Sequence, residues 1–419
     1  MQINQQALVD RFVRYVQIDT QSDPHATASP TTEKQKDLGR VLVQELHAFG
    51  LSDAELDDFG YVYATLPASP GVPADVPTLC FCAHMDTSPD VTGAGVKPII
   101  HRQWDGADIV LPDVTNAGDV PVTIRQQDHP DLAAQVGNDI ITASGTTLLG
   151  ADNKAGVAAI MAAAEYLINH PDVRHGRIRL LFTPDEEVGK GTANIDMQKL
   201  DATYGYTIDG ESLGTLEDET FSADGVDIII QGVSTHPGFA KGKLENALKI
   251  AGEILAALPK DRLSPETTEG KEGFVHPTHM DGNQDRVTLS FIVRDFTTEG
   301  LHRHEAMLQT LVDDVLKNYP RSTATLTVRE QYRNMKEVLD QHPAVTENAL
   351  EAMRRTGLTP QRRSIRGGTD GSRLSFMGLP CPNIFAGEHA FHSREEWVSV
   401  QDMQKAAEVI VHLAQVWAE

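Results

Sequence analysis

The chain has 419 residues, of which 40% are apolar and 23% charged, and its 36 Lys and Arg against 60 Asp and Glu give a formal net charge of −24. This acidity disfavours nucleic acid and anionic membranes as partners, and the composition is that of a globular protein with a substantial core. The length exceeds the size at which single cores usually stop growing, so we expect two domains.

Short apolar runs alternate with helical patterns through the first half of the chain. Apolar side chains recur at helical spacing in three stretches, residues 5–16, 31–49 and 154–168. Buried strands are predicted over three apolar runs, residues 78–83, 178–182 and 204–208. This alternation predicts an α/β domain with a mostly parallel sheet flanked by helices.

After Asp209 the pattern changes to amphipathic strands and helices, which predicts a separate α+β domain. The strands are predicted over residues 227–233 and 287–294, and the helices over 244–258 and 302–318.

A buried strand over residues 382–386 with flanking helices then returns, so the C-terminal segment is predicted to complete the first domain. We expect residues 1–218 and 334–419 to form one discontinuous domain. Residues 219–333 would form a smaller inserted α+β domain.

The cysteines and the start of the chain bear on the cellular compartment. The chain has an odd number of cysteines, namely Cys80, Cys82 and Cys381, and the first two share one face of a predicted strand. Polar and charged residues occur throughout the first 16 residues, which lack the apolar core of a secretory signal, and no apolar run is long enough to cross a bilayer. We therefore expect a cytoplasmic protein with reduced core thiols and no cysteine-based zinc site.

Acidic and imidazole side chains follow the buried strands at the points where they end. The clusters that follow strands are His84 and Asp86, Asp185 to Glu187, Asp209, and Glu388, His389 and His392. A further acidic residue, Asp152, lies between Gly150 and the helix predicted near residue 154. In open α/β sheets ligands bind outside the carboxyl ends of the strands, where these side chains would converge. Histidine and carboxylate without sulfur suit zinc, manganese or cobalt, so the pattern predicts a two-metal hydrolase.

Each cluster alone also has an ordinary structural explanation. Asp152 could cap a helix, and Asp209 could belong to a simple turn. The pair Glu186 and Glu187 could be the solvated start of a helix, and His392 a surface residue. The joint occurrence of these residues at strand ends is what favours a site.

Four segments are similar to motifs of the tripeptide aminopeptidases in the zinc-dependent M20 family of peptidases. They cover residues 83–89, 148–156, 182–191 and 366–371, and the similarity runs over nearly the whole chain, including residues 236–238, 294–296 and 375–383.

The resemblance implies a set of metal ligands. His84 and Asp209 would bind one Zn²⁺, Glu187 and His392 the other, and Asp152 would bridge both. Co²⁺ or Mn²⁺ could substitute for zinc at these two sites per subunit.

The resemblance also implies catalytic and substrate-binding roles. Asp86 would orient His84, and Glu186 would be the general base. Residues 1–218 and 334–419 would be the catalytic domain, and the inserted residues 219–333 would be a lid of the kind that also serves dimerisation. In this lid, His236 resembles a histidine that stabilises the tetrahedral oxyanion, although a core or capping role is the alternative. Arg294 and Arg366 could hold the terminal carboxylate of a peptide, and each could equally be a structural ion pair.

The implied substrates are short peptides, mainly tripeptides with a free N-terminus, and the enzyme could be a homodimer in which His236 acts in cis or in trans. Another M20-type hydrolase remains open, namely a dipeptidase, a carboxypeptidase or a deacylase of N-acyl amino acids. A non-catalytic binding protein of this fold should lack the general base, whereas Glu186 is present.

The resemblance further predicts a cis peptide bond between Asp152 and Asn153. Two features depart from the family pattern. Asn153 stands where relatives commonly carry a second aspartate, and residues 387–391 before His392 also differ. The preferred metal and the preferred side chains of the substrate therefore stay open.

Overall fold

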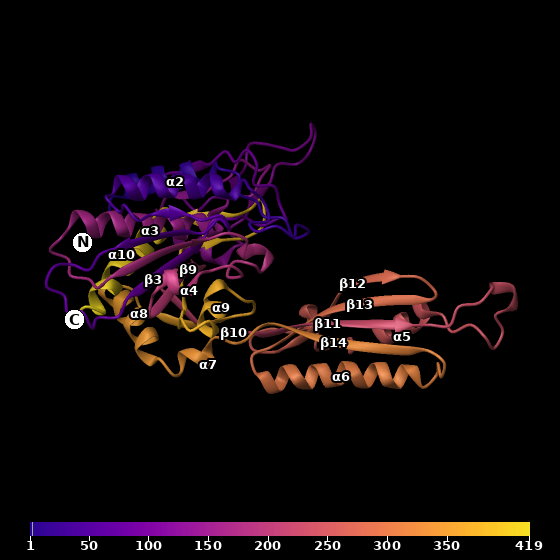
Figure 1. Ribbon diagram of the computed structural model, residues 1–419. Coiled ribbons are helices and arrows are strands. Elements are labelled where there is room, and N and C mark those ends of the chain that lie inside the picture. Colours follow the sequence, from indigo (N-terminus) through magenta and orange to yellow (C-terminus); the bar gives the residue numbers. More distant parts are fainter. Residues whose placement is uncertain (2) are drawn as a thin grey trace. The chain divides into compact units, whose positions relative to one another are not determined.

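The computed structural model describes residues 1 and 3–419, which form two compact units (Figure 1). The first unit comprises Met1–Asp218, Glu337–Arg363 and Thr369–Glu419, and the second comprises Glu219–Lys336 and Ser364–Gly368. The second unit therefore extends three residues beyond the predicted boundary at residue 333. It also includes residues 364–368, which the prediction placed in the first domain. The reason is that the guanidinium of Arg366 donates to backbone carbonyls of Gly270 and Glu272, which holds its segment in the second unit.

The first unit contains an eight-stranded mixed sheet. Its order is β1 (Glu55–Leu56), β2 (Val62–Leu66), β8 (Ile178–Thr183), β3 (Leu79–His84), β9 (Tyr204–Gly210), β16 (Asn383–Phe385), β10 (Thr215–Thr220) and β15 (Gln361–Ile365). The four central strands, β8, β3, β9 and β16, run parallel, whereas β2 and β10 pair antiparallel with the outer two of these four. The expected α/β architecture is confirmed, with the parallel pairing confined to the centre.

Helices cover both faces of this sheet. They are α1 (Gln5–Val16), α2 (Gln35–Ala48), α3 (Ala151–Asn169), α4 (Met197–Leu200), α7 (Lys336–Leu339), α8 (Pro343–Arg355), α9 (Asp370–Phe376) and α10 (Val400–Val416). On one face the hydroxyl of Tyr206 donates to the Val345 carbonyl of α8 and accepts from Trp417, just after α10. On the other face Leu374 of α9 packs with the buried thiols Cys80 and Cys82. All three cysteines are free and buried, as predicted.

Helix α2 begins at Gln35, four residues later than predicted. The backbone N–H of Thr31 donates to the Asp185 carboxylate at 2.8 Å, so this segment is held as a turn against the end of β8. The apolar spacing that predicted a helix from residue 31 carries no information about such a distant acceptor.

A four-stranded antiparallel sheet and a two-stranded ribbon complete the first unit. The sheet has the order β17 (Glu388–His389), β18 (Trp397–Ser399), β7 (Ile140–Thr142) and β4 (Ile99–His101), and the ribbon joins β5 (Ile109–Val110) and β6 (Thr123–Ile124). No helix among residues 1 and 3–419 has the length and apolar content needed to cross a membrane.

The second unit is a four-stranded antiparallel sheet with two helices. The order is β12 (Phe274–Gly282), β13 (Arg286–Asp295), β11 (Ser222–Gln231) and β14 (Thr323–Tyr332), and the helices are α5 (Ala247–Ala257) and α6 (Thr298–Leu316). Alternate residues of β11, namely Val226, Ile228 and Ile230, are buried with the apolar faces of both helices. The helices start at the caps Asn246 and Thr297, whose side chains accept backbone N–H groups of the first turn.

Candidate metal centre

The predicted ligands of the first unit converge at one edge of the sheet. His84 is the last residue of β3, Asp209 lies near the end of β9, and Glu187 follows β8 in the 3₁₀ turn η2 (Glu186–Val188). Strands β8, β3 and β9 are parallel neighbours, so their carboxyl ends meet. Asp152 reaches the same place from the start of α3.

Asp152 stands between two histidines. Its Oδ1 lies 2.9 Å from His84 Nε2, and its Oδ2 lies 3.2 Å from His392 Nε2. His84 Nε2 is also 3.4 Å from Asp209 Oδ1, and His392 Nε2 is 2.8 Å from Glu187 Oε2. The five side chains therefore form two groups of one imidazole and one carboxylate that share a central aspartate.

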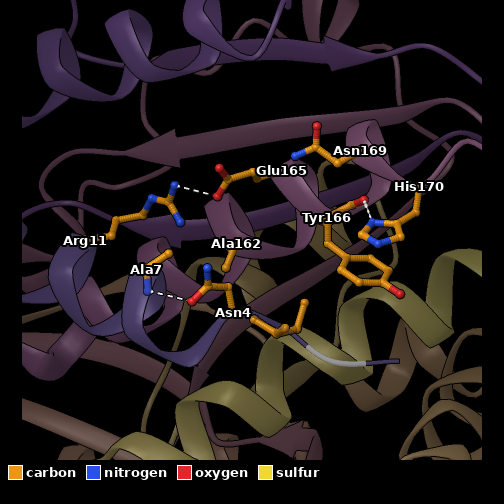
Figure 2. Close-up of a pocket in the computed structure, with 9 residues that line it drawn as sticks. Asn4, Ala7, Arg11, Ala162, Glu165, Tyr166, Asn169 and His170 are labelled. Atoms are coloured by element: carbon orange, nitrogen blue, oxygen red, sulfur yellow. Dashed lines mark hydrogen bonds and ion pairs between the residues drawn. The ribbon is translucent and has the colours of Figure 1, made fainter.

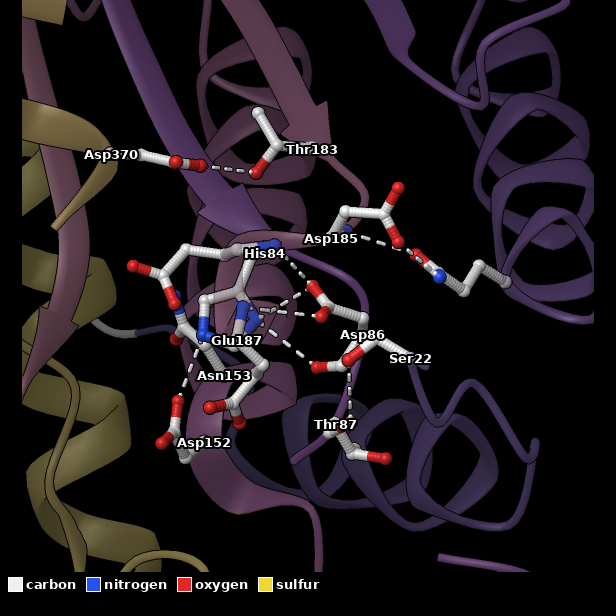
Figure 3. A network of polar contacts seen from close by, with 12 residues as sticks. Ser22, His84, Asp86, Thr87, Asp152, Asn153, Thr183, Asp185, Glu187 and Asp370 are labelled. Atoms are coloured by element: carbon white, nitrogen blue, oxygen red, sulfur yellow. Dashed lines mark hydrogen bonds and ion pairs between the residues drawn. The ribbon is translucent and has the colours of Figure 1, made fainter. Parts of the chain in front are cut away.

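Asp86 lies on the other side of His84 from Asp152 (Figure 3). The backbone carbonyl of Asp86 is 3.0 Å from His84 Nδ1, so Nδ1 carries the proton and Nε2 is left as the ligand atom. The buried Asp86 carboxylate accepts the backbone N–H groups of Glu186 at 3.0 Å and Glu187 at 3.2 Å. One residue thus fixes both the imidazole and the glutamate turn.

The loop before α3 is held by a residue that sequence reasoning missed. The carboxylate of buried Glu396 accepts the backbone N–H groups of Leu149, Gly150 and Asp152 at 2.7, 2.8 and 3.0 Å. The peptide bond between Asp152 and Asn153 is cis, as the resemblance predicted. Glu396 has no recognisable sequence signal, because the backbone N–H groups that donate to it lie more than 240 residues away along the chain.

Crowding of carboxylates shifts their proton affinities. Burial raises the pKa of Glu186 well above its usual value, and burial together with the Asp152 charge raises the pKa of Glu187 to about 8. Burial opposes the charged form of His392, but hydrogen bonds to Asp152 and Glu187 raise its pKa to about 11. Asp152 is likewise buried, yet the two histidines hold its pKa below the usual range.

This donor set fits divalent cations. One ligand atom each from His84, Asp152 and Glu187 lie within 4.8 Å of one another. Glu187 Oε1 is buried with no hydrogen-bond partner among the described residues, which a bound cation would supply. Imidazole and carboxylate are the ligands that Zn²⁺ and Mn²⁺ take in proteins.

Comparison with known proteins identifies the family. The model of peptidase family M20/M25/M40 matches residues 133–416. The chain belongs to this peptidase family. It is 45% identical to peptidase T of Geobacillus thermodenitrificans over 414 residues, and this alignment covers 99% of each chain. It is also 45% identical to peptidase T of Alkaliphilus oremlandii over 412 residues, an alignment that covers 98% of this chain and 99% of the relative.

Two solved structures of M20 peptidases share the fold. Aminopeptidase PepT from Bacillus cereus is 26% identical with a TM-score of 0.75, and the match covers 100% of both chains. A dinuclear metal-binding peptidase of family M20 from Bacillus subtilis is 14% identical with a TM-score of 0.64 over 98% of each chain.

The other predicted site residues of this M20 peptidase lie in the second unit. His236 is exposed, and its Nδ1 accepts the backbone N–H of Gly238 at 3.1 Å. The guanidinium of Arg294 donates to Gln331 Oε1 at 2.9 Å. The terminal nitrogens of Arg366 donate to backbone carbonyls of residues 268, 270 and 272 and to a hydroxyl, and its guanidinium lies over the Phe221 ring.

A separate pocket between α1 and α3 is not part of this centre (Figure 2). Its lining residues Arg11 and Glu165 form an ion pair at 2.9 Å. Glu165 lies 13 residues beyond Asp152 on α3, which corresponds to about 20 Å along a helix. We assign the pocket no part in peptide hydrolysis.

Proposed function

We propose that this M20 peptidase is a metal-dependent aminopeptidase that releases the N-terminal residue from tripeptides. One observation carries the metal-dependent hydrolysis, namely the shared Asp152 between the His84–Asp209 and His392–Glu187 groups. The choice of substrate is supported by the 45% identity to peptidase T over the full chain.

In this proposal His84 and Asp209 would hold one divalent ion, His392 and Glu187 would hold the other, and Asp152 would be shared by both. Two such ions would lower the pKa of a water molecule and polarise the scissile carbonyl. Glu186 takes the proton from the attacking water and returns it to the leaving amine nitrogen. The Asp86 carboxylate keeps Glu186 in position through the backbone of the glutamate turn.

His236 is the proposed donor to the oxyanion of the tetrahedral intermediate. A neutral imidazole whose Nδ1 accepts a hydrogen bond carries its proton on Nε2, so Nε2–H is the available donor. Arg294 and Arg366 are the proposed partners of the peptide's terminal carboxylate. Both now donate to acceptors of their own unit, so a bound carboxylate would replace one of these contacts.

The test is hydrolysis of matched tripeptide, dipeptide and N-acetyl amino acid by protein supplied with Zn²⁺, Co²⁺ or Mn²⁺, with the products identified by mass. We expect a free N-terminal residue and a dipeptide from the tripeptide. Release of the C-terminal residue would indicate a carboxypeptidase, and preference for the dipeptide or the N-acetyl amino acid would indicate the alternative M20 activities.

A further inference from the structure

Glu388 is a buried carboxylate that the proposed mechanism does not use. The residue is 1% exposed, and its Oε2 atom has no hydrogen-bond partner among the described residues. Burying an ionised carboxylate without a partner costs free energy, so this position requires a donor, a cation or a bound proton.

The fold directs Glu388 to the metal centre through the end of β16. The backbone N–H of Ala386 donates to the Gly210 carbonyl at 2.7 Å, which ties this segment to the residue after Asp209. At Gly387 the φ angle is 88°, and a Cβ there would lie 2.6 Å from the Asp402 Cβ, so glycine is required for the turn. Glu388 follows immediately at the start of β17.

The next residue shows which way Glu388 faces. The ring of His389 stacks on Trp397 with centroids 4.0 Å apart and planes at 12°. Successive side chains of a strand point to opposite sides, so Glu388 faces away from Trp397. Accordingly, one carboxylate oxygen each from Glu388, Asp152 and Asp209 lie within 4.8 Å of one another.

We infer that Glu388 is an additional ligand of the metal ion held by His84, Asp152 and Asp209. The inference rests on the metal-dependent part of the proposed function. It gives this position one imidazole and three carboxylates, whereas the His392 position keeps one imidazole and two. Four carboxylates then match the charge of two divalent ions, and the richer oxygen set makes the His84 position the more favourable one for Mn²⁺.

The burial of Glu388 argues against a different role for its carboxylate, namely binding the α-ammonium group of the peptide. A peptide can reach only exposed atoms, and Glu388 is almost fully covered. A metal ion bound between Asp152 and Asp209 needs no such access.

The first test is calorimetric titration of metal-free protein with Mn²⁺, which reports binding whether or not the protein is active. We expect two equivalents in the wild type. Glu388→Gln should weaken one of them by at least about tenfold and leave the other unchanged. Unchanged affinities in this variant would overturn the inference.

Glu217→Gln is the matched control. Glu217 is a partly buried carboxylate whose pKa the Asp209 charge helps to raise, but it accepts a hydrogen bond from Asn383 Nδ2 at 2.7 Å and belongs to no group of candidate ligands among the described residues. Equal weakening in both variants would mean that Glu388 acts by its charge alone, which overturns its role as a ligand.

The second test uses the wild type, so it does not depend on the folding of a variant. Anomalous diffraction from Mn²⁺-loaded crystals, with and without a peptide, should show a bond between the ion and a Glu388 oxygen. An ion bound by the other three residues with Glu388 facing a peptide ammonium would overturn the inference. Binding of no divalent metal at all would overturn the proposed function as well.

Discussion

Changing Asp86 to asparagine tests whether its carboxylate acts mainly on the glutamate turn or on His84. An asparagine has one carbonyl oxygen to accept hydrogen bonds, and its amide nitrogen cannot accept the second N–H. One of the two bonds at 3.0 and 3.2 Å to Glu186 and Glu187 is therefore lost, and a buried N–H is left unpaired. The cost is about 1 to 3 kcal/mol, and each kcal/mol lowers the Tm by roughly 1 to 2 °C in a protein of this size.

The same change leaves the hydrogen bond from His84 in place, because its acceptor is the backbone carbonyl of residue 86. We therefore expect Asp86→Asn to bind two metal ions at saturating metal while kcat falls by about 10- to 100-fold, since Glu186 is no longer held in position. Metal content by mass spectrometry, kcat at saturating peptide and Tm are measured on the same preparation.

Asp139→Asn is the control, because the Asp139 carboxylate also accepts a backbone N–H, from Gln103 at 2.8 Å, but is no member of the candidate metal centre. It should lower Tm without changing kcat. Our reasoning would be refuted if Asp86→Asn bound one metal ion more weakly than the wild type and had a normal kcat at saturating metal. The carboxylate would then act on the imidazole.

Further predictions concern the metals, the substrate and pH. Glu186→Gln should keep both metal ions and lose about 100-fold or more in kcat, whereas Glu187→Gln should lose one ion. Equal metal loss in the two variants would contradict the roles of Glu186 as general base and Glu187 as metal ligand. A chelator should abolish hydrolysis and Zn²⁺ or Co²⁺ restore it, and full activity without metal would exclude the proposed mechanism. A C-terminally amidated tripeptide should have a kcat/KM roughly 10- to 100-fold below that of the matched acid. Arg294→Ala or Arg366→Ala should remove this difference if that arginine binds the terminal carboxylate. Equal kcat/KM values for acid and amide in the wild type would rule out such binding. Burial and a neighbouring aspartate raise the pKa of Glu305 from 4.5 to about 7, so its contribution to stability is present below pH 4.5 and lost as the pH rises to 7. Glu305→Gln should then have a higher Tm than the wild type at pH 8 and the same Tm at pH 4, and equal Tm values at pH 8 would contradict the shift.

The convergence of His84, Asp152, Glu187 and Asp209 could be predicted because it depends on local sequence alone. His84, Glu187 and Asp209 each follow an apolar strand, and parallel neighbouring strands end at a common edge whatever the distant parts of the chain do. Asp152 comes instead from the start of the helix α3. The cis bond after Asp152 was predicted from the resemblance to the family and is found in the structure.

Contacts between distant segments could not be predicted from local pattern. Glu396 holds the loop before α3 only because β18 pairs with β7, and nothing near residue 396 indicates this pairing. The same limit explains why Thr31 was assigned to a helix, since its acceptor Asp185 lies 154 residues away. Arginine is a residue type suited to carboxylate binding, but the residue type alone does not indicate that Arg366 contacts backbone carbonyls in this structure.

The position of β16 between β9 and β10 has a consequence for the order in which the protein folds. When residue 220 has been synthesised, β9 and β10 both lack the partner that separates them in the finished sheet, and that partner ends at Phe385. At ribosomal rates of roughly 5 to 20 residues per second, about 10 to 30 s pass before it is made. The second unit has its own core and can fold in this interval, while two unpaired strand edges of the first stay open to chaperones or to aggregation.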